Sequence, residues 1–185
     1  MAQRPKAWRD GVEVVAMDGF AGSKTAASEE LPTATAVTDP FHVVRLAGNA
    51  LDQCRRRIQD ALFAGDDHVE VEATWHIYQQ MIAAYRESDP TTGKTRMKSL
   101  IAKLTHAVPA CLTEVAALGR TLKKRAADIL AFFDHPHTSN GPTEAINGRL
   151  EHLRGSALGF LNLTHYIARA LLETGGFRPA LHPRL

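Results

Sequence analysis

The chain has 185 residues, 44% of them hydrophobic and 23% charged, which is enough for one ordinary folded domain with an apolar core. Its net charge is only +2, so binding to an acidic partner must depend on local basic clusters. The two cysteines, Cys54 and Cys111, are isolated in apolar helical patterns and predict neither a disulfide framework nor a zinc ribbon, which favours the reducing cytoplasm. Residues 1–6 are polar and basic, and no stretch is apolar for long enough to span a membrane, so we expect neither secretion nor membrane insertion.

A strand, helix, strand unit is predicted near the start of the chain. The β-branched run Val12–Met17 predicts a buried strand that ends at Asp18, and a short helix is expected over Ser23–Glu30. A second strand over Ala34–Thr38 leads into Asp39. If the two strands are parallel neighbours, both aspartates emerge at the carboxyl edge of the sheet, where α/β sites usually form.

Helical spacing dominates the rest of the sequence. Apolar residues repeat at this spacing from Val43 through Ala47, Ala50 and Cys54 to Ile58, and again at Trp75, Tyr78, Ile82 and Tyr85 after a break at Gly65–Asp67. Further helices are expected over Lys94–His106 and from Pro109, where Val115, Leu118, Leu122, Ile129, Leu130 and Phe133 share one side of a long helix that ends at His135-Pro136-His137. A last helix, capped by Asn162, precedes an extended tail that opens at Gly175-Gly176.

Another predicted helix carries an acidic residue in its first turn. Asn140 or Gly141 can serve as the N-cap, Pro142 suits the first turn, and the positive end of the helix dipole favours the negative charge of Glu144. Asn147 lies on the same face as Glu144, three residues further on. The residues Ile146, Leu150 and Leu153 form an apolar stripe that we expect to face a core.

A strand-end aspartate and a first-turn glutamate, far apart in sequence, are the ligands that a two-metal phosphoryl-transfer site requires. Mg²⁺ prefers oxygen ligands, and two such ions roughly 4 Å apart can activate the attacking hydroxyl and stabilise the leaving oxygen. Asp18, Asp39 and Glu144 could supply this set. The alternative is structural, because an acid in the first turn often only stabilises a helix end, and an aspartate before glycine is often a turn residue.

Other chemistries are weakly indicated. His42, His135 and His137 could suggest zinc or iron, but the chain has no paired cysteines, so His42 is better read as a support for Asp39. No G-x-S-x-G turn or nucleotide-binding glycine loop is present. The aromatic set of Trp75, Tyr78 and Tyr85 is most simply core, with base stacking as the alternative.

Two basic clusters on predicted helices could neutralise DNA phosphates. They comprise Arg55, Arg56 and Arg57 in the first cluster and Arg120, Lys123, Lys124 and Arg125 in the second. The alternative is that each run is a solvated helix face without a ligand.

Three stretches of the sequence together resemble a known family. VEVVAMDGF, LPTATAVTDPFHVVRLAGNALDQCRRR and the run from GRTLKKRAADILAFFDHPHTSNGPTEAINGRLEHLRG to LETGGF resemble the carboxyl-terminal part of bacterial insertion-sequence transposases of the ISL-three type, over nearly the whole chain. The family is a branch of the DDE transposases. The resemblance implies a ribonuclease-H-like core interrupted by helices, and Mg²⁺-dependent cutting and joining of transposon-end DNA.

The resemblance also implies roles for individual residues. Glu144 matches the last acid of the catalytic triad, and Asp18 the middle acid, so these two would hold the metal. Asp39 and His42 match a D-x-x-H signature, and an alternative alignment makes Asp39 the middle ligand. Asn140 and Asn147 flank the glutamate and would support it.

The chain departs from the complete family pattern. Complete members carry a zinc-binding segment, a helix-turn-helix DNA reader and the first catalytic aspartate, and no residues here correspond to them. We therefore expect a truncated copy with a helix-rich α/β fold and a partial ribonuclease-H-like core of about two strands. The expected layout is one domain, with a strand-helix-strand core and basic helix over 1–60, a helical insertion over 61–137, the glutamate helix and last helix over 138–174, and a tail over 175–185.

Such a copy is expected to be inactive by itself, because two carboxylates hold magnesium less well than three. The alternative is a fragment without catalysis that still binds DNA or interacts with a full-length transposase, or with another copy of itself. Its signature would be binding to DNA that weakens steeply with salt and is lost when Lys123, Lys124 and Arg125 are neutralised.

Overall fold

The computed structural model describes residues 4–18, 21–61, 69–106, 108–157 and 159–174, and the chain divides into two compact units, Met1–Ser139 and Asn140–Leu185. Each unit is described by itself. Helices make up most of the described residues, and the strands form a small parallel sheet, so the predicted helix-rich α/β class is confirmed. The expected break at Gly65–Asp67 and the tail from Gly175 lie outside the described residues.

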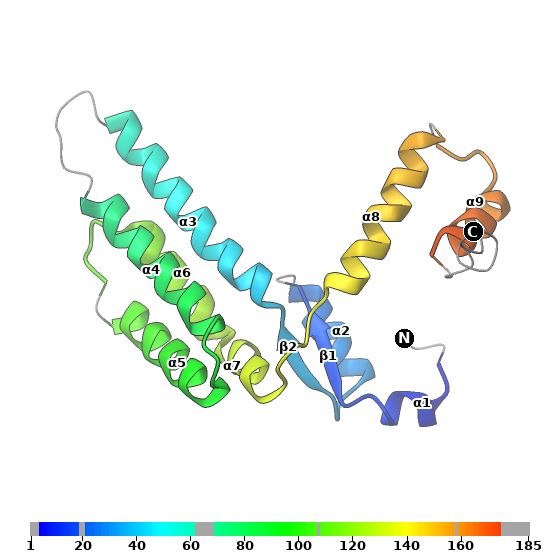
Figure 1. The fold of residues 1–185 in the computed structure, drawn as a ribbon, viewed down its shortest axis with the longest axis horizontal. Coiled ribbons are helices and arrows are strands. Elements are labelled where there is room, and N and C mark those ends of the chain that lie inside the picture. The colour runs from blue at the N-terminus through cyan, green and yellow to red at the C-terminus, as the bar shows by residue number, and fades with distance from the viewer. Residues whose placement is uncertain (1–3, 19–20, 62–68, 107, 158, 175–185) are drawn as a thin grey trace, which may run out of the picture. The chain divides into compact units, whose positions relative to one another are not determined.

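The first unit opens with the predicted strand, helix, strand arrangement (Figure 1). After a short helix, α1 (Lys6–Asp10), come strand β1 (Val14–Met17), helix α2 (Ala21–Glu30) and strand β2 (Thr35–Thr38). The two strands are parallel, with Val14 opposite Thr35 and Met17 opposite Thr38. β-branched residues in both strands favour this extended pairing. The structure therefore confirms the expected sheet, with strand bounds shorter than the sequence pattern suggested.

Five helices complete the first unit and enclose its core. They are α3 (Pro40–Ala61), α4 (Val69–Tyr85), α5 (Pro90–His106), α6 (Thr113–Lys124) and α7 (Ala126–Asp134). Figure 1 shows these helices packed side by side, and α7 also contacts β2. Met81, Met97, Leu122 and Ile129 are fully buried between them. Apolar residues at helical spacing thus supply the core that holds the sheet and the helices together.

The expected apolar face of α3 is confirmed, because Val43, Ala47, Ala50 and Cys54 are all buried. The prediction of one long helix after Pro109 was wrong, since the chain breaks at Arg125 between α6 and α7. The backbone N–H of Arg125 there bonds to the carbonyls of Thr121 and Leu122, which tightens the last turn of α6. Apolar spacing did not reveal the break, because α6 and α7 bury the expected residues except Leu130, which is partly buried.

Two further expectations need correction. Trp75 was expected on the buried face of its helix, but its side chain is 46% exposed. Thr74 is buried in its place, and its hydroxyl donates to the carbonyl of Glu70 at 2.7 Å, which satisfies the polar group inside the helix. Cys111 was placed in a helical pattern, yet it is exposed in the turn before α6.

One glycine permits a close approach of two helices in the first unit. A Cβ added at Gly119 of α6 would lie 2.1 Å from the carbonyl oxygen of Leu104 on α5. That separation is far below van der Waals contact, so only glycine fits without a backbone shift. Gly119 therefore sets the distance between α5 and α6.

The second unit contains helices α8 (Gly141–Ser156) and α9 (Leu163–Thr174), which contact each other. The predicted cap of the last helix is confirmed, since the side-chain oxygen of Asn162 accepts from the backbone N–H of Thr164 at 2.8 Å. The prediction that Ile146, Leu150 and Leu153 are buried was wrong, because α8 has no buried residue among those described and Ile146 is 40% exposed.

In the part of the chain that the structure describes, no helix has both the length and the apolar character needed to cross a membrane.

Candidate active site

The two predicted aspartates lie together at one edge of the sheet. Asp18 directly follows β1, and Asp39 directly follows β2. Because the strands are parallel and Met17 is paired with Thr38, the two acids emerge at the same carboxyl edge. The backbone N–H of Asp39 donates to the carbonyl of Met17 at 2.9 Å, so the ladder continues to this point. The sheet geometry that the sequence predicted is confirmed.

Asp39 caps helix α3. Asp39 is buried, with 4% of the residue exposed. One oxygen of its carboxylate accepts from the backbone N–H of Phe41 at 2.8 Å. The other oxygen accepts from the hydroxyl of Ser139, also at 2.8 Å. Both oxygens of a buried carboxylate thus have donors, as burial of a charge requires. This arrangement gives Asp39 a structural role at the start of α3.

Asp18 has a different environment. It is half-buried, and one carboxylate oxygen accepts from the hydroxyl of Ser23 on α2 at 3.2 Å. Its backbone carbonyl accepts from the guanidinium of Arg125 at 3.2 Å. The strand end is therefore held through its main chain, and one oxygen of its carboxylate accepts a long bond from a hydroxyl.

Arg125 joins the two strand ends. The nitrogen that donates to the Asp18 carbonyl also lies 3.3 Å from the hydroxyl oxygen of Thr38, at the end of β2. Its side chain is only 13% exposed, and its Nε lies 3.9 Å from a carboxylate oxygen of Asp128. The sequence placed Arg125 among DNA-binding residues, but in the structure it fastens the α6–α7 junction to the sheet edge.

An ion pair with a buried carboxylate supports this junction. Asp128 on α7 is 5% exposed, and both its oxygens accept from the ammonium group of Lys24 on α2, at 2.7 and 2.9 Å. A buried carboxylate is costly without a partner, so this pair ties α7 to α2. The sequence reasoning missed both residues. The signal was present, because Asp128 interrupts the apolar run of α7 at a position that faces the core.

His42 and Tyr85 lie near Asp39. His42 is half-buried in the first turn of α3, and its backbone N–H donates to the carbonyl of Asp39 at 3.1 Å. Burial and the negative charge of Asp39 both raise the pKa of the Tyr85 phenol, so the hydroxyl stays protonated. That buried hydroxyl has no hydrogen-bond partner among the described residues. The environment of Asp39 is therefore largely closed to water.

Glu144 belongs to the second unit and lies in the first turn of α8, as the sequence predicted. Asn140 occupies the N-cap position, where its side chain makes no cap hydrogen bond, and its carbonyl accepts from the backbone N–H of Glu144 at 3.0 Å. Pro142 sits in the first turn. Glu144 and Asn147 are both exposed, so their polar atoms can reach a ligand.

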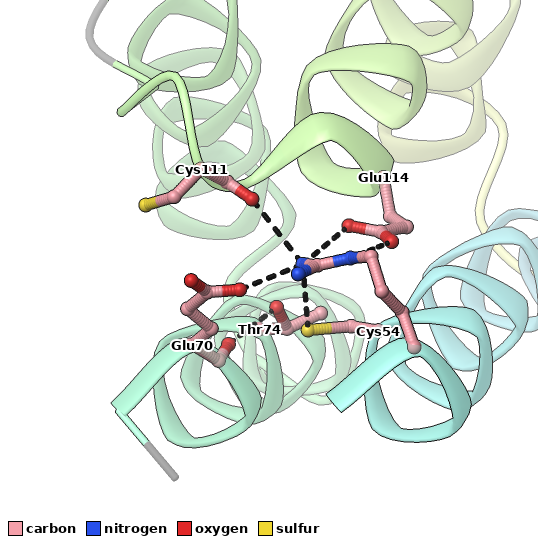
Figure 2. A network of polar contacts seen from close by, with 6 residues as sticks. Cys54, Glu70, Thr74, Cys111 and Glu114 are labelled. Carbon is pink, nitrogen blue, oxygen red and sulfur yellow. Dashed lines mark hydrogen bonds and ion pairs between the residues drawn. The ribbon is translucent and has the colours of Figure 1, made fainter. Parts of the chain in front are cut away.

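The first basic cluster is divided in the structure. Arg55 and Arg56 are exposed on α3, whereas Arg57 bonds to Glu70, Cys111 and Glu114 in a polar network. Figure 2 labels these three partner residues. Its guanidinium donates to Glu114 and Glu70, each at 2.7 Å, and to the carbonyl of Cys111 at 3.2 Å. This network links the end of α3 to the starts of α4 and α6.

The Arg57 network shifts the pKa of its members. Its hydrogen bond to Arg57 lowers the pKa of the Glu114 carboxyl, and the bonds to Glu114 and Glu70 raise the pKa of Arg57. Two carboxylates thus compensate the charge of Arg57. In the second cluster, Arg120, Lys123 and Lys124 are exposed on α6 and differ in this respect from Arg125.

Across residues 4–18, 21–61, 69–106, 108–157 and 159–174, no three His, Cys, Asp or Glu side chains are grouped closely enough to hold a metal ion. The described part of the first unit thus brings Asp18 and Asp39 to one edge. Glu144, Asn140 and Asn147 are gathered at the start of α8 in the second unit.

The fold and the paired strand-end acids define a helix-rich α/β protein with a candidate acidic site at the carboxyl edge of its sheet. Comparison with known protein families agrees with this description. The sequence model of the transposase family DDE_Tnp_ISL3 matches residues 1–69 and 59–170. The chain belongs to this family of ISL-three-type DDE transposases. No curated protein and no solved structure matches it. Family membership assigns the chain a general role as a transposase.

Proposed function

We propose that the chain contributes Asp18 and Glu144 to a Mg²⁺-dependent site that acts on the phosphodiester backbone of insertion-sequence DNA. The observation that carries the proposal is the position of Asp18, at the carboxyl edge of two parallel strands in a chain of the DDE transposase family. Ligands in α/β folds bind at this edge. We also propose that the two-stranded sheet is part of a ribonuclease-H-like core.

Asp18 is the better candidate for the middle acid than Asp39. The carboxylate of Asp39 is buried and accepts from a backbone N–H and from Ser139, and a metal would have to displace these donors. Asp18 is half-buried, so its carboxylate is more accessible to a metal than the buried carboxylate of Asp39. Asp39 would then support the edge as the cap of α3, with His42 beside it.

The donor chemistry fits magnesium. Asp18 and Glu144 offer carboxylate oxygens, which a hard cation prefers, and Glu144 is exposed at a helix start. When bound, Mg²⁺ would supply Lewis-acid activation of the reacting phosphate. Two local features support these ligands: Arg125 donates to the main-chain carbonyl of Asp18, and Glu144 lies in the first turn of α8. Asn140 and Asn147 would support the glutamate.

DNA is the proposed partner, held through phosphate contacts. Exposed cations suited to this role are Arg55, Arg56, Arg120, Lys123 and Lys124. Arg57 is less suited, because its guanidinium already bonds to two carboxylates of the protein. Each phosphate neutralised releases counterions, so binding should weaken as salt rises. A full-length transposase or a second copy of this chain is a further proposed partner.

We further propose that this polypeptide by itself does not complete strand cleavage. Two carboxylates bind a metal more weakly than three, and the engaged oxygens of Asp39 make it a poor substitute for a third ligand. The second candidate function follows, namely DNA binding or interaction with an active transposase without catalysis. The exposed cations of α6 favour this second function.

A cleavage assay tests the proposal. Purified chain is incubated with labelled transposon-end duplexes and Mg²⁺ or Mn²⁺, beside Asp18→Asn, Asp39→Asn and Glu144→Gln. Glu151→Gln is the matched control, because Glu151 is an exposed acid on the same helix. We expect no nicking by the chain alone. Nicking that Glu144→Gln abolishes and Glu151→Gln preserves would overturn the proposed inactivity, and nicking that survives Asp18→Asn would overturn the site assignment.

A further inference from the structure

A pocket of about 630 Å³ lies between helix α2 and the α6–α7 junction. Lys24, Thr25 and Ser28 line it from α2, and Thr121, Lys124 and Arg125 line it from the other side. Pockets of this volume are large enough for a nucleotide-sized group. All of these residues belong to the first unit, so the pocket is formed within one compact body.

The pocket adjoins the sheet edge that carries Asp18. Arg125 is part of the pocket wall, and the same guanidinium donates to the Asp18 carbonyl at 3.2 Å. Lys24 is also part of the wall, and its ammonium group bonds to the buried carboxylate of Asp128. A ligand in the pocket would therefore lie beside the candidate metal ligand, on a wall that the ion pair of Lys24 and Asp128 keeps in place.

The charges around the pocket match those of one phosphodiester. The three cations Lys24, Lys124 and Arg125 face two carboxylates, Glu29 in the lining and Asp128 behind it, which leaves one excess positive charge. A phosphodiester carries one negative charge. Lys24 has a third N–H besides the two that bond to Asp128, and the hydroxyls of Ser28 and Thr121 add donors.

We propose that this pocket seats a backbone phosphate of DNA next to the Asp18 edge. The inference rests on the proposed function, since it names the part of the protein that would hold the strand beside the reacting position. Cations and hydroxyls together are the side chains that contact DNA phosphates, and such contacts fix the register of a strand without reading its sequence. The pocket differs from the surface around the exposed arginines of α3, because it is concave and is lined by both α2 and the α6–α7 junction.

Fluorescence anisotropy with a labelled duplex tests the pocket, in EDTA and over a range of salt concentrations. Lys124→Gln is compared with Lys98→Gln, an exposed lysine on α5 that does not line the pocket. We expect Lys124→Gln to weaken binding severalfold and to reduce the salt slope by about one, while Lys98→Gln leaves both unchanged. Equal effects of the two variants, or no duplex binding at low salt, would overturn the proposal.

A neutral substitution separates the pocket from general attraction between charges. Ser28→Ala keeps the charge and suits a helix, so we expect weaker binding with an unchanged salt slope. Unchanged affinity in Ser28→Ala would contradict a phosphate seated at α2. Competition by inorganic phosphate or a mononucleotide at the concentration of DNA phosphate would instead indicate a small-molecule site. Because no metal is present, failure here is distinct from failure of the catalytic assignment, which the cleavage assay reports.

Discussion

The two compact units of the chain differ in what holds their helices. In the first unit, α3 to α7 enclose a core in which Met81, Met97 and Leu122 are fully buried. In the second, α8 and α9 have no buried residue among those described, and Leu163 and Leu171 of α9 are 70% and 60% exposed. The Asp18 edge is therefore fixed by packing, whereas Glu144 depends on the local stability of one helix.

Glycine substitutions should show the largest difference between the units. Gly119→Ala forces a methyl group against the Leu104 carbonyl, and we expect a loss of about 3 kcal/mol of unfolding free energy. The matched change is Gly148→Ala in α8, where the added Cβ would meet no described atom within 4 Å apart from its chain neighbours and the backbone of its own helix. It should instead raise helix stability by about 0.5–1 kcal/mol. Circular dichroism during chemical unfolding measures both, and equal effects would contradict the difference in packing.

Removal of the cation that pairs with a buried carboxylate should have the next largest effect. Lys24→Met leaves Asp128 buried with Arg125 at 3.9 Å as its remaining cation, so we expect a loss of about 2 kcal/mol. Lys94→Met is the control, because Lys94 pairs with Asp134 at a similar distance but the acid is 55% exposed. That pair should contribute well under about 1 kcal/mol. Denaturant midpoints compare the stabilities of the two variants. A larger loss of unfolding free energy in Lys94→Met than in Lys24→Met would contradict the stabilising role of the Lys24–Asp128 pair.

A smaller effect is expected from acidification of the Arg57 network. The pKa of Glu114 is lowered in the folded state by Arg57, so its contribution is complete above the ordinary glutamate pKa and is lost as pH falls through the lowered value. Because Arg57 is partly exposed, we expect the Arg57–Glu114 pair to contribute about 1 kcal/mol to the unfolding free energy. Unfolding free energies of the native chain and Glu114→Gln should converge on acidification. A constant difference at all pH values would show that the ion pair contributes nothing.

The sequence was sufficient where one pattern decided the structure. Alternation and turn residues placed Asp18 and Asp39 at parallel strand ends, and Pro142 with Asn140 located the start of α8. It was insufficient where tertiary contacts decided. Arg125 belongs to a basic run and looks like a surface residue, but the chain breaks there and its side chain turns to the strand ends. Charge spacing cannot distinguish this partly buried arginine from its exposed neighbour Lys124.

The site was predicted only in part for a related reason. Strand position alone could not separate Asp18 from Asp39, because both follow strands of similar pattern. The structure separates them through the donors to Asp39, which come from Phe41 in the next helix and from Ser139, a hundred residues away. A contact of that sequence separation leaves no local signal. The apolar stripe of α8 correctly predicted a helix but wrongly predicted burial, because none of its described residues is buried.

The central claim is that Asp18 and Glu144 bind the same metal ion, and paramagnetic broadening by Mn²⁺ tests it most directly. Carboxyl carbons of the labelled full chain are observed by NMR while Mn²⁺ is added well below one equivalent. We predict that the signals of Asp18 and Glu144 broaden together, and that Asp18→Asn abolishes the broadening at Glu144. Broadening at Glu144 that persists in Asp18→Asn would contradict a shared ion.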